Sequence, residues 1–247
     1  MLISHHTVSV ACGAAAVRPL ASFGQPNVLV AIDLKDAPSD HKAESLLDRD
    51  ELSRALAFRQ DDDRLRYIAS HAALRQILAT LLGGKPKDIC FRRGQYGKPF
   101  IERGVNIPGY FNLSHTKELA VVAVNMTYEV GIDIETIQSI PDAAAIAAIQ
   151  FSTRENLTLA ELPELEKITG FYHCWTQREA VLKLYGWGLM TASTGIEIEA
   201  DPRKAPRVLA VPNPAIPPKL IALSGINGHL GCLALPPQIH RMICLRW

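Results

Sequence analysis

The sequence predicts an α+β fold made of two lobes of similar size. Each half of the chain combines helical patterns with several strand-like runs, which is the element content of an α+β fold. A chain of 247 residues is also long enough to form two small hydrophobic cores. We expect the boundary near Asn125–Glu129, so the lobes would span residues 1–127 and 128–247. Proteins of this shape commonly bind small ligands where the lobes meet.

The N-terminal half begins with a strand and continues with helix. Asn27–Leu34 is rich in β-branched residues, as strands are. From Asp48 to Leu82 the spacing of apolar residues is helical, and the glycines that follow are a normal helix stop. Gly94–Pro99 is dense in turn-forming residues. Further strands are predicted at Ile89–Phe91, Tyr110–Leu113 and Leu119–Asn125, with a turn at residues 114–117.

The C-terminal half opens with a strand at Val130–Glu135 and then becomes helical. Helices are predicted at Pro141–Gln150, Glu155–Leu162 and Ile168–Tyr185. Strand-like runs follow at Gly195–Glu199, Arg207–Val211, Leu220–Leu223, Leu230–Leu235 and Met242–Leu245. Proline-rich breaks separate several of these runs, as expected between strands.

The composition excludes several classes of function. Lys plus Arg total 26 against 25 Asp plus Glu, so no overall charge attracts nucleic acid or an anionic membrane. Five scattered cysteines without a Cys-x-x-Cys pair argue against a disulfide framework or a zinc knuckle. No apolar run approaches the ~20 residues of a membrane span, and the start of the chain lacks the basic residues of a secretory signal. We therefore expect a cytoplasmic protein that binds neither nucleic acid nor membrane.

The strand V-G-I-D-I-E carries the first chemical signal. Side chains alternate along a strand, so Asp133 and Glu135 would share one face, opposite the apolar residues. Two carboxylates ~7 Å apart along the backbone repel unless a cation lies between them or they share a proton. Mg²⁺ suits this arrangement, with a substrate phosphate completing its shell. The same pair also occurs on solvated strand faces that hold no site.

A second signal lies in the helix predicted to end near Tyr185. Trp175, Glu179 and Lys183 recur every four residues, which places them on one stripe of a helix. A Glu followed four residues later by a Lys is also a plain surface pair, worth only ~0.3–0.5 kcal/mol. The aromatic residue on the same stripe and the G-W-G-L break directly after the helix favour the wall of a site.

Two shorter segments carry candidate phosphate contacts. The segment F-N-L-S-H-T puts the Ser114 hydroxyl, the His115 imidazole and turn amides at a strand end, where they could hold phosphate oxygens. An Asn and a Ser that bond their own backbone in a turn would give the same sequence. In G-K-P, Pro99 stiffens the turn and Lys98 could direct its charge at a phosphate.

The order of these motifs is more informative than any one of them. From Tyr96 to Leu189 the chain reads Y-G-K-P-F, F-N-L-S-H, V-G-I-D-I-E, W-T-x-R-E-A-V-L-K and G-x-G-L. This series resembles the Sfp-type 4′-phosphopantetheinyl transferases. The resemblance implies a magnesium-dependent enzyme that transfers the 4′-phosphopantetheine group of coenzyme A to a serine of an apo-carrier protein and releases 3′,5′-ADP. The partner would be an acyl, peptidyl or aryl carrier protein.

The resemblance also implies a fold and a role for each matching residue. The two lobes would be pseudo-symmetric, each a small antiparallel sheet packed with helices, with coenzyme A and Mg²⁺ at their interface in a monomeric protein. The N-terminal lobe would contact the nucleotide, and the C-terminal lobe the metal and the carrier. The residues that match metal ligands are Asp133, Glu135 and Glu179. Those that match coenzyme A contacts are Arg54, Arg66, Lys98, Ser114, His115 and Lys183. The catalytic groups would be Glu179, Lys183 and Glu135, with either glutamate as the base.

Three positions and two alternative functions stay open. Glu51 falls where the family has a basic residue that helps to hold the 3′-phosphate of coenzyme A, and Arg59 is a nearby candidate to replace it. Glu155 matches a glutamate that some members use near the metal, but Ser152–Glu155 is also a capping box. Phe151 lies in a region that resembles the carrier-binding surface. The alternative functions are a different Mg²⁺-dependent phosphoryl or nucleotidyl transferase and a non-catalytic carrier-protein binder.

Overall fold

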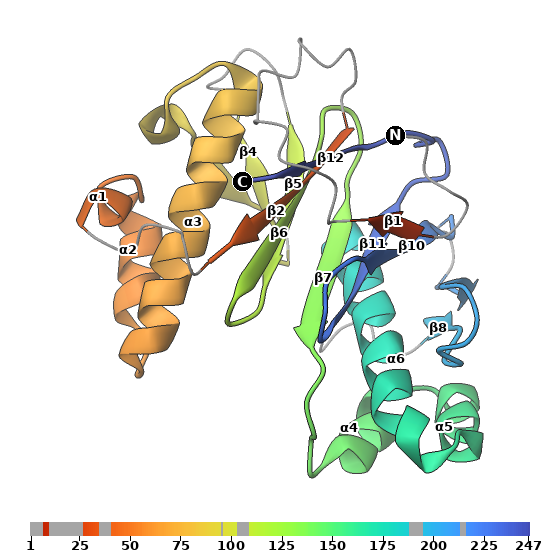
Figure 1. The fold of residues 1–247 in the computed structure, drawn as a ribbon. Coiled ribbons are helices and arrows are strands. Elements are labelled where there is room, and N and C mark those ends of the chain that lie inside the picture. The colour runs from red at the N-terminus through yellow and green to blue at the C-terminus, as the bar shows by residue number, and fades with distance from the viewer. Residues whose placement is uncertain are drawn as a thin grey trace.

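The protein forms four layers in the order helix, sheet, sheet, helix (Figure 1). The computed structural model describes residues 7–9, 27–34, 41–94, 96–102, 109–187, 195–212 and 216–247, the first of these ranges by its backbone alone. The helix α3 (Asp61–Leu82) covers one sheet, and α6 (Glu164–Tyr185) covers the other. In the described part of the chain, no helix combines the length and the apolar character needed to cross a membrane.

The first sheet is built mainly from the N-terminal half. The elements of this half, together with the late strand that joins its sheet, are β2 (Asn27–Asp33), α1 (His41–Glu44), α2 (Arg49–Leu56), α3, a 3₁₀ turn (Pro86–Asp88), β3 (Phe91–Arg93), β4 (Pro99–Ile101), β5 (Tyr110–His115), β6 (Leu119–Asn125) and β12 (Ile243–Arg246). The strand order is β12-β2-β6-β5. The pairs β2–β6 and β6–β5 are antiparallel, and β12 lies parallel beside β2. The strands β3 and β4 form a separate hairpin.

The second sheet is built mainly from the C-terminal half. The elements of this half, together with the early strand that joins its sheet, are β1 (Thr7–Ser9), β7 (Gly131–Thr136), α4 (Ala143–Gln150), α5 (Thr153–Glu161), α6, β8 (Glu197–Ile198), β9 (Val208–Ala210), β10 (Lys219–Ser224) and β11 (His229–Leu235). The strand order is β1-β10-β11-β7. The pairs β10–β11 and β11–β7 are antiparallel, and β1 lies parallel beside β10. The short strands β8 and β9 pair with each other.

Both halves repeat one connection pattern, which confirms the predicted α+β class. In each half a strand is followed by the long helix, a short two-stranded hairpin and two further strands, and the first strand pairs with the last, as β2-β6-β5 and β7-β11-β10. The strands at the two ends of the described chain cross between the halves, because β1 joins the second sheet and β12 joins the first. A division of the chain at residue 127 therefore does not separate the two sheets completely.

Alternating side chains divide the apolar core between the layers. In β2, Val30 packs with α3, whereas Leu29 packs into the space between the sheets. In β7, Ile132 and Ile134 lie between the sheets, so Asp133 belongs to the opposite face, on the side of α6. The strand therefore has the alternation that its sequence predicts.

Some predicted elements differ from those in the structure. The helical pattern from Asp48 to Leu82 contains two helices, because α2 ends at Leu56 and α3 starts only at Asp61. Ser114 and His115 lie inside β5 and not in a turn, since the pairing with β6 continues to the end of that strand. The strand β1 was not predicted. Of the G-x-G-L break, residues 188 and 189 lie outside the described residues.

Candidate active site

The edge strands β5 and β7 meet through side chains of β5. The Oδ1 atom of Asn112 accepts a hydrogen bond from the Ile132 amide at 2.8 Å, and the Oγ atom of Ser114 accepts one from the Ile134 amide at 3.2 Å. The partners advance in the same direction, so the two strands run parallel. Asn112 and Ser114 thus bond the backbone of the neighbouring strand and not their own turn. These bonds join the two halves of the molecule along one edge.

Helix α6 lies very close to β7, and Gly131 makes this approach feasible. A methyl group at position 131 would lie 2.0 Å from the main-chain oxygen of Ala180, which no side chain tolerates. The close approach holds the stripe of Glu179 and Lys183 over the acidic face of β7. The glycine at the start of V-G-I-D-I-E therefore serves the packing of the helix.

A cavity of about 270 Å³ opens where β5, β7 and α6 converge. Its lining residues are Leu113, Ser114, His115, Asp133, Glu135, Trp175, Glu179 and Lys183. We call it the acidic cavity. It brings together the three predicted metal residues, Lys183 and the Ser-His pair from three separate sequence motifs. The stripe of Trp175, Glu179 and Lys183 forms one wall, as the four-residue spacing predicts.

Asp133 is the buried centre of this cluster, with an exposed fraction of 3%. Its Oδ1 atom lies 2.6 Å from the Nζ atom of Lys183 and accepts a hydrogen bond from Ser114 Oγ at 3.0 Å. Its Oδ2 atom is buried without a hydrogen-bond partner among the described residues, and so is Oε1 of Glu179. Buried carboxylate oxygens are rarely left unbonded. These two atoms are therefore suited to bind a further donor or cation.

Burial and mutual repulsion change the titration of two carboxyl groups in the acidic cavity. Partial burial and then the negative charge of Asp133 raise the pKa of Glu135 to about 7. The same two causes raise the pKa of Glu179 to about 7. Trp175 also hydrogen-bonds to Glu135. A carboxyl group with such a pKa can exchange a proton at neutral pH.

The carboxylates do not form a closed set of metal ligands as they stand. Within the described ranges, no group of three His, Cys, Asp or Glu side chains is arranged so that it could hold a metal ion. The ammonium group of Lys183 lies against Asp133 and takes up one of its two oxygens. The role of the three acids as metal ligands stays a prediction.

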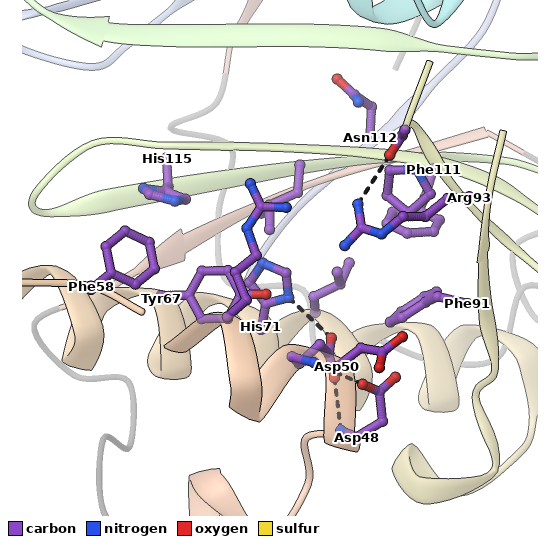
Figure 2. Close-up of a pocket in the computed structure, with 16 residues that line it drawn as sticks. Asp48, Asp50, Phe58, Tyr67, His71, Phe91, Arg93, Phe111, Asn112 and His115 are labelled. Atoms are coloured by element: carbon purple, nitrogen blue, oxygen red, sulfur yellow. Dashed lines mark hydrogen bonds and ion pairs between the residues drawn. The ribbon is translucent and has the colours of Figure 1, made fainter. Parts of the chain in front are cut away.

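A larger cavity of about 620 Å³ adjoins the acidic cavity at His115, which lines both. We call it the nucleotide-sized cavity. Figure 2 shows Tyr67 and His71 on the side of α3, and Phe111 and Asn112 with His115 on the side of β5. Its other lining residues are Asp48, Asp50, Glu51, Arg54, Phe58, Leu74, Phe91, Arg93, Gly97, Pro99 and Leu113. Ligand cavities in proteins commonly have this size and this mixture of apolar and polar walls.

His115 stands between the two cavities in a positive environment. The surrounding protein atoms and then the positive charges of His71 and Lys183 lower its pKa. A neutral imidazole can still donate one hydrogen bond to an anion. His115 is therefore suited to contact a ligand that extends through both cavities.

The two arginines predicted to contact coenzyme A are placed differently. Arg54 lines the nucleotide-sized cavity, as the prediction requires. Arg66 lines neither cavity, because its guanidinium group pairs with Asp63 one turn earlier. The charge of Arg66 nevertheless contributes to the lowered pKa of His115. Direct contact of either arginine with coenzyme A stays a prediction.

Lys98 is turned toward the protein interior and lines neither cavity. Its Nζ atom pairs with Glu129 and donates hydrogen bonds to the main-chain oxygens of Val130 and Leu184, each at 3.1 Å. Burial lowers the pKa of this lysine, and the charge of Glu129 opposes that shift. The G-K-P turn is thereby tied to the start of β7 and the end of α6. A phosphate contact of Lys98 stays a prediction.

Glu51 is a buried, fully engaged carboxylate. It closes a capping box with Asp48 at the start of α2, and its Oε2 atom accepts a hydrogen bond from Arg75 Nε at 2.6 Å. Its Oε1 atom lies 3.0 Å from Nδ1 of His71. Burial alone would raise the pKa of Glu51, but the hydrogen bonds from His71 and Asp48 and the charge of Arg75 lower it below its usual value. The acid that replaces a basic residue is thus neutralised within the protein.

Glu155 has structural partners for both of its oxygens. It closes the capping box with Ser152, pairs with Arg178 at 2.5 Å and accepts a hydrogen bond from the Ile198 amide at 2.8 Å. With an exposed fraction of 1%, it does not line the acidic cavity. These contacts indicate a structural role for Glu155 at the start of α5.

Phe151 is also buried, in an aromatic cluster with Phe171 and Trp175. The exposed apolar residue of this region is Ile149, at the end of α4. A direct contact of Phe151 with a carrier protein would require this cluster to open.

Three further residues of the nucleotide-sized cavity were not predicted to belong to a site: Tyr67, His71 and Arg93. His71 shares the polar side of its helix with Ser70 and Arg66, so the helical pattern held a weak signal. Arg93 held none, because only the fold brings β3 to face α3.

Comparison with known proteins matches both halves of the chain. Residues 129–222 match the family model of the 4′-phosphopantetheinyl transferase superfamily, and residues 37–127 match the model of the N-terminal region of 4′-phosphopantetheinyl transferases. The chain is 36% identical over 167 residues to the 4′-phosphopantetheinyl transferase HetI of Nostoc sp., a match that covers 67% of this chain and 70% of that protein.

Other relatives match over shorter stretches. The chain is 32% identical over 127 residues to the 4′-phosphopantetheinyl transferase gsp of Aneurinibacillus migulanus, covering 51% of each protein. It is 34% identical over 128 residues to the 4′-phosphopantetheinyl transferase psf-1 of Bacillus pumilus, covering 51% of this chain and 52% of that protein. With both halves matched by models of one family and most of HetI aligned, this chain belongs to the 4′-phosphopantetheinyl transferase superfamily.

Proposed function

We propose that this protein transfers the 4′-phosphopantetheine group from coenzyme A to a serine hydroxyl of an apo-carrier protein in a Mg²⁺-dependent reaction. The observation that carries the proposal is the convergence of Asp133, Glu135, Glu179 and Lys183 on one cavity that adjoins a nucleotide-sized cavity at His115. An acidic site for a cation beside a cavity for a nucleotide is what the transfer of a phosphate-linked group requires.

The donor atoms of the acidic cavity suit a divalent cation in their chemistry, and the three carboxylates would close around the ion when it binds. Asp133 Oδ2 and Glu179 Oε1 are buried oxygens without a described partner, and carboxylate oxygens are the ligands that Mg²⁺ prefers. Three carboxylates and one ammonium group line the cavity, so two negative charges remain when all are ionised. Asp133, Glu135 and Glu179 would hold the ion. When bound, Mg²⁺ neutralises the pyrophosphate of coenzyme A and the charge that develops on the leaving group.

The two adjoining cavities support an orientation for coenzyme A. The nucleotide would occupy the larger cavity, and the pyrophosphate would lie at His115, where the cavities meet. Lys183 is within the acidic cavity and already lies 2.6 Å from a carboxylate oxygen, so its charge is available to a phosphate oxygen after a small rotation. Fixed cationic and donor groups of this kind stabilise charge that grows during the reaction.

The transfer moves one proton and one phosphoryl group. The serine oxygen forms a bond to the phosphorus that carries pantetheine, and the bond from that phosphorus to the bridging oxygen breaks, leaving its electron pair on 3′,5′-ADP. Glu179 or Glu135 would accept the serine proton. Both have a pKa of about 7, which suits a general base at neutral pH.

The partner, assembly and location belong to the same proposal. The substrate would be an acyl, peptidyl or aryl carrier protein that approaches the C-terminal half, next to the acidic cavity. The protein would act as a monomer in the cytoplasm, where coenzyme A and apo-carriers are available.

The test is incubation with a panel of apo-carrier proteins, coenzyme A and MgCl₂, followed by mass spectrometry of the carriers. We expect at least one carrier to gain one phosphopantetheine group, with no gain when EDTA replaces MgCl₂. The variant Asp133→Ala should give no product, whereas Glu161→Ala, which removes an exposed carboxylate at the end of α5, should behave like the wild type. Full modification by Asp133→Ala would overturn the metal assignment. Turnover of ATP without any dependence on coenzyme A would point to a different phosphoryl transferase.

A further inference from the structure

We infer that His71, oriented by Glu51 and paired with Tyr67, binds the 3′-phosphate of coenzyme A. This inference rests on the proposed function and names a specificity-determining group that the family assignment does not supply. The cavity that would receive the nucleotide is lined by three acids, Asp48, Asp50 and Glu51, which oppose a phosphate. A phosphomonoester can bind there only if the acids are neutralised and cationic groups face the ligand.

The neutralisation is visible in the buried network beneath the cavity. Arg75 has an exposed fraction of 1%, and its Nε and Nη2 atoms lie 2.6 Å from Glu51 and 2.5 Å from Asp48. Its Nη1 atom bonds the main-chain oxygens of Pro86 and Ile89, so this guanidinium group is fully used inside the protein. Arg75 therefore offsets charge on Glu51 and Asp48, two of the three acids, and is not available to the ligand.

His71 is the hydrogen-bond donor that the same network presents to the cavity. A carboxylate can only accept, so Nδ1 of His71 carries a proton and donates it to Glu51 at 3.0 Å. This bond fixes the ring and leaves Nε2 as the nitrogen for a ligand. His71 lines the cavity on the α3 side, facing the strand that carries His115 (Figure 2). The basic group absent at position 51 is thus supplied from the neighbouring helix.

Tyr67 provides an independent sign of a ligand at this point. Its ring stacks on the His71 ring with centroids 3.9 Å apart, and it lines the same cavity. Tyr67 has an exposed fraction of only 5%, yet its hydroxyl has no hydrogen-bond partner among the described residues. Burial and then the charge of Glu51 raise the pKa of Tyr67 to about 12, so the hydroxyl is a neutral donor. A buried donor without a partner is expected where a ligand supplies the acceptor.

The position along the cavity favours the 3′-phosphate over the pyrophosphate. The pyrophosphate would lie at His115, where the two cavities meet. His71 is close enough to contribute to the lowered pKa of His115. In coenzyme A the pyrophosphate and the 3′-phosphate are attached to the 5′ and 3′ oxygens of the same ribose. The 3′-phosphate would therefore enter the larger cavity next to His115, between β5 and the Tyr67–His71 pair.

The test compares coenzyme A with 3′-dephospho-coenzyme A, which lacks only the group in question. We expect His71→Ala to raise the KM for coenzyme A roughly 10-fold or more, as expected for loss of a charge-assisted hydrogen bond, and to leave the KM for the dephospho substrate unchanged. Tyr67→Phe keeps the stacked ring and should raise the KM for coenzyme A alone by roughly 3-fold or more. Glu51→Gln should also raise the KM for coenzyme A alone, without lowering kcat, because it weakens the hydrogen bond that orients His71. Lys87→Ala, an exposed cation of the same half that lines neither cavity, is the matched control and should change neither KM.

Equal loss for both substrates in His71→Ala, or no loss for either, would overturn the inference. If His71→Ala fails to fold, Tyr67→Phe decides the question, because it removes an oxygen that has no hydrogen-bond partner among the described residues. Calorimetric binding of the two nucleotides without a carrier separates this inference from the proposed function. A wild-type protein that binds coenzyme A more tightly than the dephospho form but transfers nothing would defeat the function and keep the phosphate site. Equal binding of both nucleotides by the wild type would remove the site.

Discussion

Replacing Glu179 with glutamine should make the metal-free protein more stable while abolishing transfer. The change keeps the shape of the side chain but removes one negative charge from a cavity that Asp133 and Glu135 also line. In the absence of Mg²⁺ that charge is unfavourable, because burial and the charge of Asp133 oppose it. Stability and activity should therefore change in opposite directions.

The size of the effect follows from the pKa of Glu179, which is raised from 4.5 to about 7. At about 1.4 kcal/mol for each pH unit, the charged form is destabilised by roughly 3 kcal/mol at pH 8. Solvent screening around a partly exposed side chain reduces this, so we expect a gain of about 1–2 kcal/mol in the free energy of unfolding. In a domain of this size, that gain corresponds to a rise of roughly 2–8 °C in Tm.

The assay is thermal unfolding at pH 8 with EDTA and with MgCl₂, together with carrier modification by mass spectrometry. The wild type should gain Tm with MgCl₂, and Glu179→Gln should gain little, because one ligand of the ion is gone. Glu161→Gln, an exposed glutamate on α5, is the control and should melt like the wild type under both conditions. A lower Tm of Glu179→Gln in EDTA would refute the repulsion argued from the structure.

Three further predictions test other parts of the same framework. Gly131→Ala should lower the free energy of unfolding, measured with urea, by about 3 kcal/mol or more, because its methyl group would lie 2.0 Å from the backbone of α6. The control Gly94→Ala meets only an ordinary contact at 3.6 Å and should unfold much like the wild type. Between about pH 4.5 and 7, the raised pKa values of Glu135 and Glu179 make these two groups bind more protons in the folded state than in the unfolded state, so in EDTA the wild type should lose Tm with rising pH relative to the double variant Glu135→Gln/Glu179→Gln; a Tm difference that stays constant across that range would contradict this. Glu155→Ala should lower the free energy of unfolding by about 3–5 kcal/mol, because it leaves the buried Arg178 without its ion-pair partner, yet the variant should keep its kcat at a temperature where it is folded. A folded variant without activity would show that Glu155 has a catalytic role.

The parts of the site that could be predicted are those set by local periodicity. Two-residue alternation in β7 separates Asp133 from the apolar residues, and four-residue spacing in α6 aligns Glu179 with Lys183. These local rules hold because β7 and α6 are regular along these residues, so backbone geometry alone sets which side chains share a face. Their meeting around one cavity was implied by the order of the motifs and is observed in the structure.

The parts that could not be predicted depend on contacts between distant segments. Nothing local distinguishes a Ser that bonds its own turn from Ser114, which bonds the amide of Ile134 in another strand. Lys98 reads as an exposed turn residue, yet main-chain oxygens from two other elements hold its ammonium group. The compensation of Glu51 by His71 likewise joins two helices, and its signal appears only when their contact is known.

The crossing of β1 and β12 between the sheets has a consequence for biosynthesis. The first sheet recruits its outer strand from residues 243–246, which pair in register with residues 28–31. While the ribosome is still making the second half, the N-terminal segment holds an unpaired edge at β2, open to pairing with other nascent chains. Completion of that sheet must wait until residues 243–246 have emerged, so neither half can finish folding long before the other.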